Sequence, residues 1–226
     1  VGNKETKTGP ASVKLFPCYP DTPTFRYTCA RYHDCMGAVD GVVKGLVDKL
    51  EKDGLLEDTF IFYFGDHGGV LPGSKGYIHE YGLHVPLVVR IPENWRDRVH
   101  LQRGSRCGAV VSFIDFGATV LHLAGVDVPP VVDGRPFMGP GIAAGDLEKR
   151  DETFGYADRF DEKYDMCRSL RRGRYTYIRN YQAWYPDSLQ NNYRYKMVAY
   201  REWRELHTAG KLNAVQDRFF ECKPPE

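Results

Sequence analysis

The feature that most constrains the fold is an uninterrupted apolar run, residues 59–64, that ends in Gly65-Asp66-His67-Gly68-Gly69. The run is aromatic and β-branched and does not alternate with polar residues, which is typical of a strand buried on both faces of a parallel sheet. A second apolar run, Val85 to Ile91, is bounded by prolines and predicts another strand. Strands of this kind need layers that cover them, so the sequence favours an α/β core.

Helical periodicity supplies those layers. Apolar residues recur at steps of three and four from Tyr32 to Leu50, and Gly54 follows where a helix C-cap belongs. A second helix is predicted over residues 112–124, where Ser112 and Asp115 have the spacing of a capping pair. The segment 107–111 is a shorter strand candidate, and the alternation of strands and helices favours a layered core.

The pattern changes near residue 145, where glycine and proline cluster. We therefore predict one part of an α/β core over residues 1–145 and a smaller α+β subdomain over residues 146–226. Within the second part, residues 167–170 and 174–179 flank a glycine and predict a hairpin. Residues 188–209 predict an amphipathic helix, and Asn213 is a predicted N-cap for a last helix.

Composition excludes several classes of protein. Hydrophobic residues make up 42% of the 226, which is enough for a buried core. Lys+Arg is 31 and Asp+Glu is 30, so a nucleic-acid partner is not expected, although four arginines in 168–174 leave a local polyanion-binding patch open. The sequence has no apolar run of about 18 residues, and no membrane span is predicted.

The six cysteines do not predict a metal or disulfide framework. No pair has C-x-x-C spacing, which argues against a zinc knuckle and a small disulfide scaffold. We interpret Cys29 and Cys35 as small buried hydrophobic residues, with a pairing across the helix start as the alternative.

Asp66 and His67 are the first candidate site residues. They follow directly after the predicted strand, and ligand sites of open α/β sheets form at the carboxyl ends of strands. A carboxylate and an imidazole at this position can ligate a divalent cation. An isolated D-H-G is better explained by an Asp that caps the next turn and a hydrogen-bonded loop histidine.

The following stretch changes this interpretation. Lys75 is followed by Glu80, Gly82 and Val85-Pro86-Leu87, all downstream of the G-D-H-G sequence. In this order and spacing the segment resembles the sulfatase family, a branch of the alkaline-phosphatase superfamily. Further segments are similar to the same family: residues 32–40, 112–125 and 133–137, with residues 166–181 similar to bacterial relatives of the heparan N-sulfatases.

The resemblance implies an alkaline-phosphatase-like parallel-sheet sandwich and a sulfuric-ester hydrolase that acts on sulfated carbohydrate. It implies that Asp66 and His67 ligate one divalent cation, usually Ca²⁺, and that Lys75 acts on a sulfate oxygen as a catalytic and substrate-binding group. Most relatives have asparagine in place of His67, which leaves the metal open. His79 and His84 are candidate substrate contacts, while Glu80 and Gly82 are read as structural. Analogy with the family also implies a periplasmic or secreted protein.

The family's nucleophile is absent from the sequence. Sulfatases use a formylglycine made from a C/S-x-P-S/T-R motif, and Cys18 is followed by Tyr19-Pro20-Asp21-Thr22, without the arginine. We therefore expect a truncated chain, inactive alone, whose formylglycine and paired metal-binding aspartates lie in a preceding part. A metal-dependent phosphodiesterase or phosphomutase of the same superfamily, and a non-catalytic module that binds sulfated glycans, are the alternatives.

Overall fold

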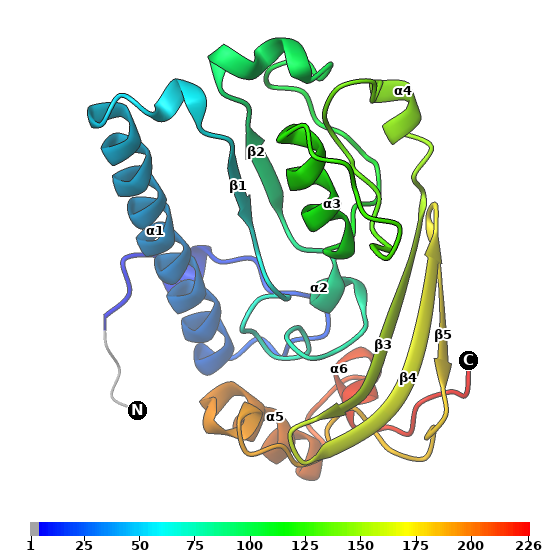
Figure 1. The fold of residues 1–226 in the computed structure, drawn as a ribbon. Helices are drawn as coiled ribbons and strands as arrows, with labels where there is room; N and C mark the ends of the chain where they lie inside the picture. The colour runs from blue at the N-terminus through cyan, green and yellow to red at the C-terminus, as the bar shows by residue number, and fades with distance from the viewer. Residues whose placement is uncertain (1–4) are drawn as a thin grey trace.

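The two apolar runs form strands β1 (Ile61–Phe64) and β2 (Leu87–Arg90) in the computed structural model, which describes residues 5–226 (Figure 1). The strands pair antiparallel, with Ile61 opposite Arg90 and Phe64 opposite Leu87. The predicted parallel direction is wrong for this pair, because an apolar run reports burial and carries no signal for the direction of its neighbour. The α/β class is confirmed.

Two helices flank this pair of strands, as the periodicity predicted. Helix α3 (Ile114–Leu123) packs on one face, where its Leu123 joins a core with Phe62, Val89 and Phe137. Helix α1 (Pro23–Lys52) runs along the other side of the strands (Figure 1). It begins where the Thr22 hydroxyl accepts a hydrogen bond from the Phe25 N–H group, and Gly54 follows its end at φ 71°.

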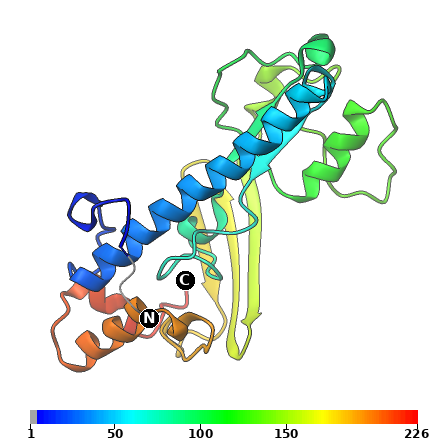
Figure 2. The same cartoon turned by 90° about the vertical axis from the view of Figure 1, so that its left-hand side faces the viewer.

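Only the first turns of α1 are buried. Phe25 and Ala30 are inaccessible to solvent, whereas the predicted stripe further along the helix leaves Met36 40% and Leu46 61% exposed. Cys35 is also exposed, so its predicted burial was wrong, while Cys29 is buried as expected. Figure 2 shows why: α1 extends well beyond the C-terminal helices that cover its first turns.

The second sheet has the order β3-β4-β5, with both pairs antiparallel. The predicted hairpin is confirmed as β4 and β5, joined through Gly173 at φ 55°. The predicted strand at residues 107–111 does not form. A single backbone hydrogen bond, from the Val110 N–H group to the Arg150 carbonyl, joins this segment to another part of the chain, and one bond is too few for a strand pair. The remaining elements are α2 (Glu80–Leu83), α4 (Ala144–Leu147), β3 (Glu152–Phe160), β4 (Lys163–Arg172), β5 (Tyr175–Asn180), α5 (Val198–Thr208) and α6 (Ala214–Asp217).

Strand β3 was not predicted, because its large aromatic side chains are exposed to solvent and its small residues face the protein. Phe154 and Tyr156 are 73% and 76% exposed, whereas the small residues that alternate with them, Thr153, Gly155 and Ala157, are partly buried. A Cβ added to Gly155 would lie 3.0 Å from Cδ1 of Leu83 in α2. Small residues on this face therefore let α2 approach the sheet, and α2 belongs to the loop that carries the candidate site.

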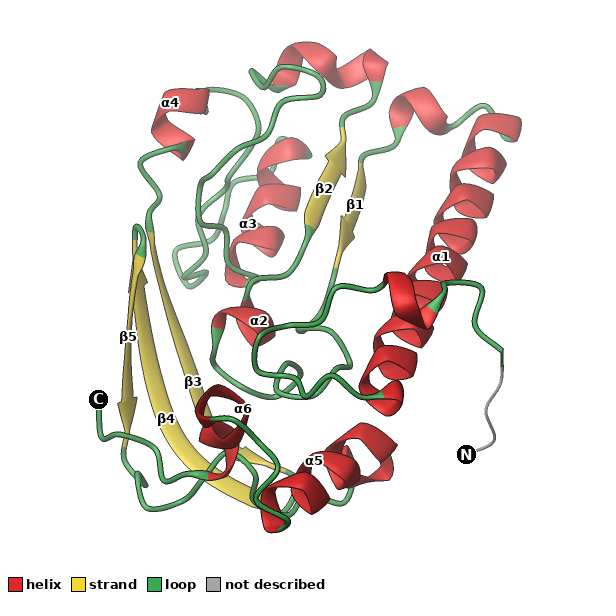
Figure 3. Ribbon diagram, turned by 180° about the vertical axis from the view of Figure 1, so that it is seen from behind, coloured by secondary structure: helices red, strands yellow, loops and turns green. Residues whose placement is uncertain are grey.

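Helix α5 lies near the start of α1 (Figure 3), and its Ala199 and Trp203 share a core with Val13, Tyr19 and Phe25. Trp203 of α5 packs against Tyr19 and Phe25, with ring centroids 6.0 and 5.8 Å away. The single helix predicted over 188–209 is wrong: Met197 is extended (ψ 127°), and only α5 beyond it is α-helical. Asn213 caps α6 as predicted, since its side chain accepts hydrogen bonds from the N–H groups of Val215 and Gln216. The division at residue 145 stays a prediction.

Among residues 5–226, we find no helix with both the length and the apolar character that a membrane crossing requires.

Candidate functional site

The Asp66–His67 turn follows β1 directly and faces solvent. The Asp66 side chain is 82% exposed and that of His67 is 35% exposed. His67 Nδ1 lies 2.8 Å from the Gly68 carbonyl, to which it can donate only if it carries the proton. His67 Nε2 is then free as a ligand, and it lies 3.5 Å from Oδ1 of Asp66. Two donor atoms at this separation fit a shared cation, whose bonds to each would be about 2.0–2.6 Å long.

No third ligand joins this pair within the described part of the chain. No cluster of three His, Cys, Asp or Glu side chains there is arranged to hold a metal. The pair by itself supplies one carboxylate and one imidazole, fewer than the six to eight ligands that Ca²⁺ takes.

Two motif glycines hold the Asp66–His67 turn against α2. The Gly68 N–H group donates to the Gly82 carbonyl over 3.0 Å. A Cβ on Gly68 would overlap the Tyr81 carbonyl oxygen, and one on Gly82 would overlap that of Tyr77. The backbone therefore approaches here more closely than any side chain permits, which is the physical reason for glycine at both positions.

Lys75 lies beside the same turn. Its backbone N–H group donates over 3.1 Å to the carbonyl of Gly69, which is two residues beyond His67 in the sequence. Its ammonium lies 3.4 Å from the Tyr193 hydroxyl and 4.9 Å from the centre of that ring. The fold thus brings the backbone of the predicted sulfate-binding lysine beside the turn that carries the predicted metal ligands. It places the ammonium of that lysine against a tyrosine that sequence reasoning did not single out.

Glu80 links this loop to the second sheet. Nη1 of Arg171 on β4 lies 2.9 and 3.0 Å from its two carboxylate oxygens, and Nδ1 of His84 lies 2.8 Å from one of them. Arg168, in the same arginine-rich segment, pairs with Asp158 at 2.5 Å. Two of the four arginines are therefore engaged by carboxylates, and the segment is less basic than its sequence indicates.

His79 occupies the N-cap position of α2 and is engaged from the C-terminal part. Its Nε2 lies 3.3 Å from Oδ2 of Asp187, and its ring stacks on Tyr77 with centroids 6.1 Å apart. The Tyr77 hydroxyl donates to the Asp187 carbonyl over 3.0 Å. Nothing near Asp187 in the sequence forms a recognisable motif, so this partner could not be found before the structure.

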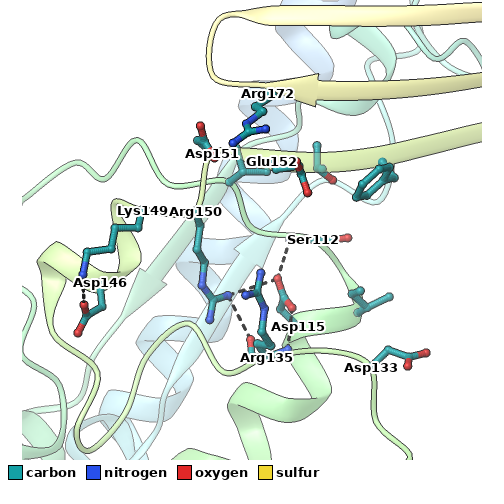
Figure 4. Close-up of a pocket in the computed structure, with 14 residues that line it drawn as sticks. Ser112, Asp115, Asp133, Arg135, Asp146, Lys149, Arg150, Asp151, Glu152 and Arg172 are labelled. Atoms are coloured by element: carbon teal, nitrogen blue, oxygen red, sulfur yellow. Dashed lines mark hydrogen bonds and ion pairs between the residues drawn. The ribbon is translucent and has the colours of Figure 1, made fainter.

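A separate hollow of about 680 Å³ lies between α3 and the start of β3 (Figure 4). Asp115 lines it and accepts hydrogen bonds from the N–H groups of Arg135 and Ser112, over 2.9 and 3.1 Å, beside the Arg150 guanidinium. The predicted capping pair is thus half formed, because the Ser112 side chain makes no cap bond. A Cβ on Gly134 would overlap the Ile114 carbonyl, so this region serves to fasten the 133–137 turn to α3.

Comparison with known proteins decides the family of this chain. The model of the family named Sulfatase matches residues 6–126, which is more than half of the chain. The chain belongs to the sulfatase family.

Two curated sulfatases show the extent of the similarity. The chain is 33% identical over 224 residues to an ulvan-active sulfatase of Formosa agariphila, a match that covers 99% of this chain and 35% of that protein. It is 34% identical over 107 residues to the N-acetylglucosamine-6-sulfatase of Bos taurus, across 45% and 18% of the two chains. This sulfatase-family chain therefore spans about a third of the length of the first relative.

Solved structures agree with the sulfatase assignment at the level of the fold. A Bacteroides fragilis protein provisionally called a sulfatase superposes with a TM-score of 0.57 at 18% identity, over 90% of this chain and 48% of its own. The phosphonate monoester hydrolase of Silicibacter pomeroyi gives a TM-score of 0.55 at 20% identity, over 92% and 46%. At these identities the likeness shows the alkaline-phosphatase-like fold alone.

Proposed function

We propose that this chain forms part of the active site of a sulfuric-ester hydrolase that acts on sulfated carbohydrate. One observation carries the proposal: the Lys75 N–H group bonds to the Gly69 carbonyl, so the lysine lies next to the Asp66–His67 turn. A cation pair of this kind, one metal and one ammonium, stabilises the charge on a sulfuryl group and on the oxygen that leaves it.

In this proposal Asp66 and His67 hold one divalent cation, taken as Ca²⁺ from the family resemblance. The free Nε2 atom of His67 and the exposed Asp66 carboxylate support this assignment. When bound, such a cation would supply positive charge beside the ester. Lys75 would bind a sulfate oxygen through its ammonium, which is a compact charge on a flexible stem.

His79 and His84 are proposed to lie beside the substrate. Each has a carboxylate on one ring nitrogen, Asp187 for His79 and Glu80 for His84. Such a partner orients an imidazole and leaves its other nitrogen available for a substrate hydroxyl. This supports a role in carbohydrate binding, and the names of the two relatives, which refer to ulvan and to N-acetylglucosamine, favour a sugar as the substrate.

The chain has no C/S-x-P-S/T-R motif, so we propose that the 226-residue chain by itself hydrolyses no sulfate ester. The first test is therefore binding. The purified chain is titrated with sodium sulfate in the presence of Ca²⁺, and the backbone amide resonances of Gly69 and Lys75 are followed by NMR. We expect saturable shifts, and we expect Lys75→Met to weaken sulfate about tenfold, because a charged hydrogen bond is lost.

Lys211→Met is the matched control, since Lys211 is an exposed lysine that follows α5 in the sequence. It should leave the sulfate affinity unchanged, and Asp66→Ala should weaken Ca²⁺ in calorimetry. Equal sulfate affinity of wild type and Lys75→Met would refute the role of the lysine. Turnover of an aryl sulfate by the chain alone would refute its inactivity, while sulfated-glycan binding without any sulfatase activity in a longer chain would favour a binding module.

A further inference from the structure

Tyr193 reaches the candidate lysine from a segment 118 residues further along the chain. The Lys75 ammonium lies 3.4 Å from its hydroxyl, and the Tyr193 side chain is partly open to solvent, at 42% exposure. Tyr193 also packs edge-on against Phe160 of β3, with centroids 6.1 Å apart. The tyrosine therefore lies between the partly buried Phe160 ring and the lysine.

The turn that carries Tyr193 is fixed on both sides. Asn191 is completely buried; its amide group donates to the Phe160 carbonyl over 3.1 Å and accepts from the Arg194 N–H group over 2.9 Å. Arg194 is only 4% exposed, and its Nη2 donates to the Gly76 carbonyl over 2.8 Å. Gly76 directly follows Lys75, so the same short turn holds both the lysine's neighbour and the tyrosine.

Arg194 is held mainly by aromatic rings. Its guanidinium lies 3.9 Å from the centre of Tyr77 and 4.6 Å from that of Phe160, while its Nε and Nη1 atoms have no hydrogen-bond partner among the described residues. Stacking of this kind stabilises a desolvated arginine. Gly76 has φ 81°, and a Cβ there would lie 2.6 Å from Nη2 of Arg194, so the close contact depends on glycine.

This geometry assigns a chemical role to the tyrosine hydroxyl. An ammonium only donates hydrogen bonds, so Lys75 donates to the phenol oxygen, and the phenol proton stays available for another acceptor. Two donors 3.4 Å apart can reach two oxygens of one tetrahedral anion. We propose that Tyr193 is a second sulfate-binding residue, which donates to the sulfate group that Lys75 contacts and orients the Lys75 ammonium toward it. The proposal rests on the proposed function.

The test uses the 226-residue chain and inorganic sulfate as the probe. Tyr193→Phe keeps the ring and removes only the hydroxyl, and we expect it to weaken sulfate about tenfold with an unchanged midpoint of urea unfolding. Tyr156→Phe on β3 is the control: Tyr156 is 76% exposed and should leave the affinity at its wild-type value. Tyr193→Leu should weaken sulfate at least as much as Tyr193→Phe does.

A second measurement needs no variant. With tyrosines labelled at the carbon that bears the hydroxyl, the Tyr193 resonance should shift on sulfate addition with the same dissociation constant as the Lys75 amide, and the Tyr156 resonance should not move. If Lys75→Met loses sulfate while Tyr193→Phe binds it normally, the inference is wrong and the role of Lys75 survives. If Lys75→Met binds sulfate normally, the proposed function itself fails.

Discussion

At the scale of single residues, the motif glycines matter because of what touches them. Gly68 and Gly82 lie where the Asp66–His67 turn meets α2, with no room for a Cβ at either position. Gly41, in the exposed part of α1, has nothing within 4 Å of an added Cβ. Residues of one type thus have opposite energetic roles, and their surroundings decide which.

This contrast gives a matched pair of variants. Gly82→Ala should lower the free energy of unfolding by about 1–3 kcal/mol, because the new methyl group overlaps the Tyr77 carbonyl and the backbone must move. Gly41→Ala should raise it by about 0.5–1 kcal/mol, because alanine is the better helix residue. Urea unfolding curves of the two variants and wild type measure both effects, and equal stabilities would contradict the close contact at Gly82.

At the scale of elements, β4 carries a buried charge cluster that fastens the end of the chain. Lys163 is 2% exposed, and its ammonium lies 2.5 Å from Asp165; Lys223 also pairs with Asp165. Burial keeps the pKa of Lys163 below its ordinary value. Burial alone would raise the pKa of Asp165, but the ammonium groups of Lys163 and Lys223 outweigh it and lower that pKa to about 2.

The Asp165 carboxylate should therefore make stability depend on pH. Its pKa in the folded chain, about 2, is below the ordinary 3.8, so its contribution is complete above pH 4 and is lost as the pH falls toward 2. We expect this group to account for a loss of about 2 kcal/mol in the free energy of unfolding over that range. Urea unfolding at a series of pH values, with an NMR titration of the Asp165 carboxyl, measures it.

Asp165→Asn is expected to flatten this pH dependence, and it also removes the partner of a buried lysine. Asp146→Asn is the comparison, because Asp146 pairs with Lys149 on the surface, where solvent screens the charges. A pH profile that changes equally in both variants, or an Asp165 carboxyl that titrates near 4, would show that the buried pair does not lower the pKa of Asp165.

At the scale of the whole molecule, the two ends of the described chain are packed into one core. Val13, Tyr19 and Phe25 share it with Trp203 of α5, and Phe219 stacks on the Trp203 ring with centroids 4.4 Å apart. The candidate site depends on similar long-range contacts, since Tyr193 and Asp187 reach the loop of Lys75 and His79 from the C-terminal part.

Trp203→Ala should therefore affect distant parts of the chain together. We expect a loss of about 3–5 kcal/mol in the free energy of unfolding, because a fully buried aromatic ring is removed. Trp184 is 63% exposed, and Trp184→Ala should change stability by less than about 1 kcal/mol. Amide hydrogen exchange should speed up at Cys29 and Ala30 of α1 in the first variant. Unchanged exchange there would show that α1 and α5 do not unfold as one unit.

The sequence by itself determined most of the local elements and indicated where the candidate site lies. The apolar runs, the periodic segments and the glycine turns predicted β1, β2, α1, α3 and the β4–β5 hairpin, because burial and turn chemistry leave a mark at short range. The ordered motif from Asp66 to Leu87 predicted the family, which the match over residues 6–126 confirms. The roles of Asp66, His67 and Lys75 stay predictions.

Only the tertiary structure decided the direction of the β1–β2 pair and the exposure of the α1 stripe and of the aromatic residues on β3. It also decided the partners of the site residues: Arg171 for Glu80, Asp187 for His79 and Tyr193 for Lys75, which lie 91, 108 and 118 residues apart in the chain. The physical reason is the same in each case. A sequence pattern records how a segment is buried, whereas a contact between distant segments depends on how all of the intervening elements pack.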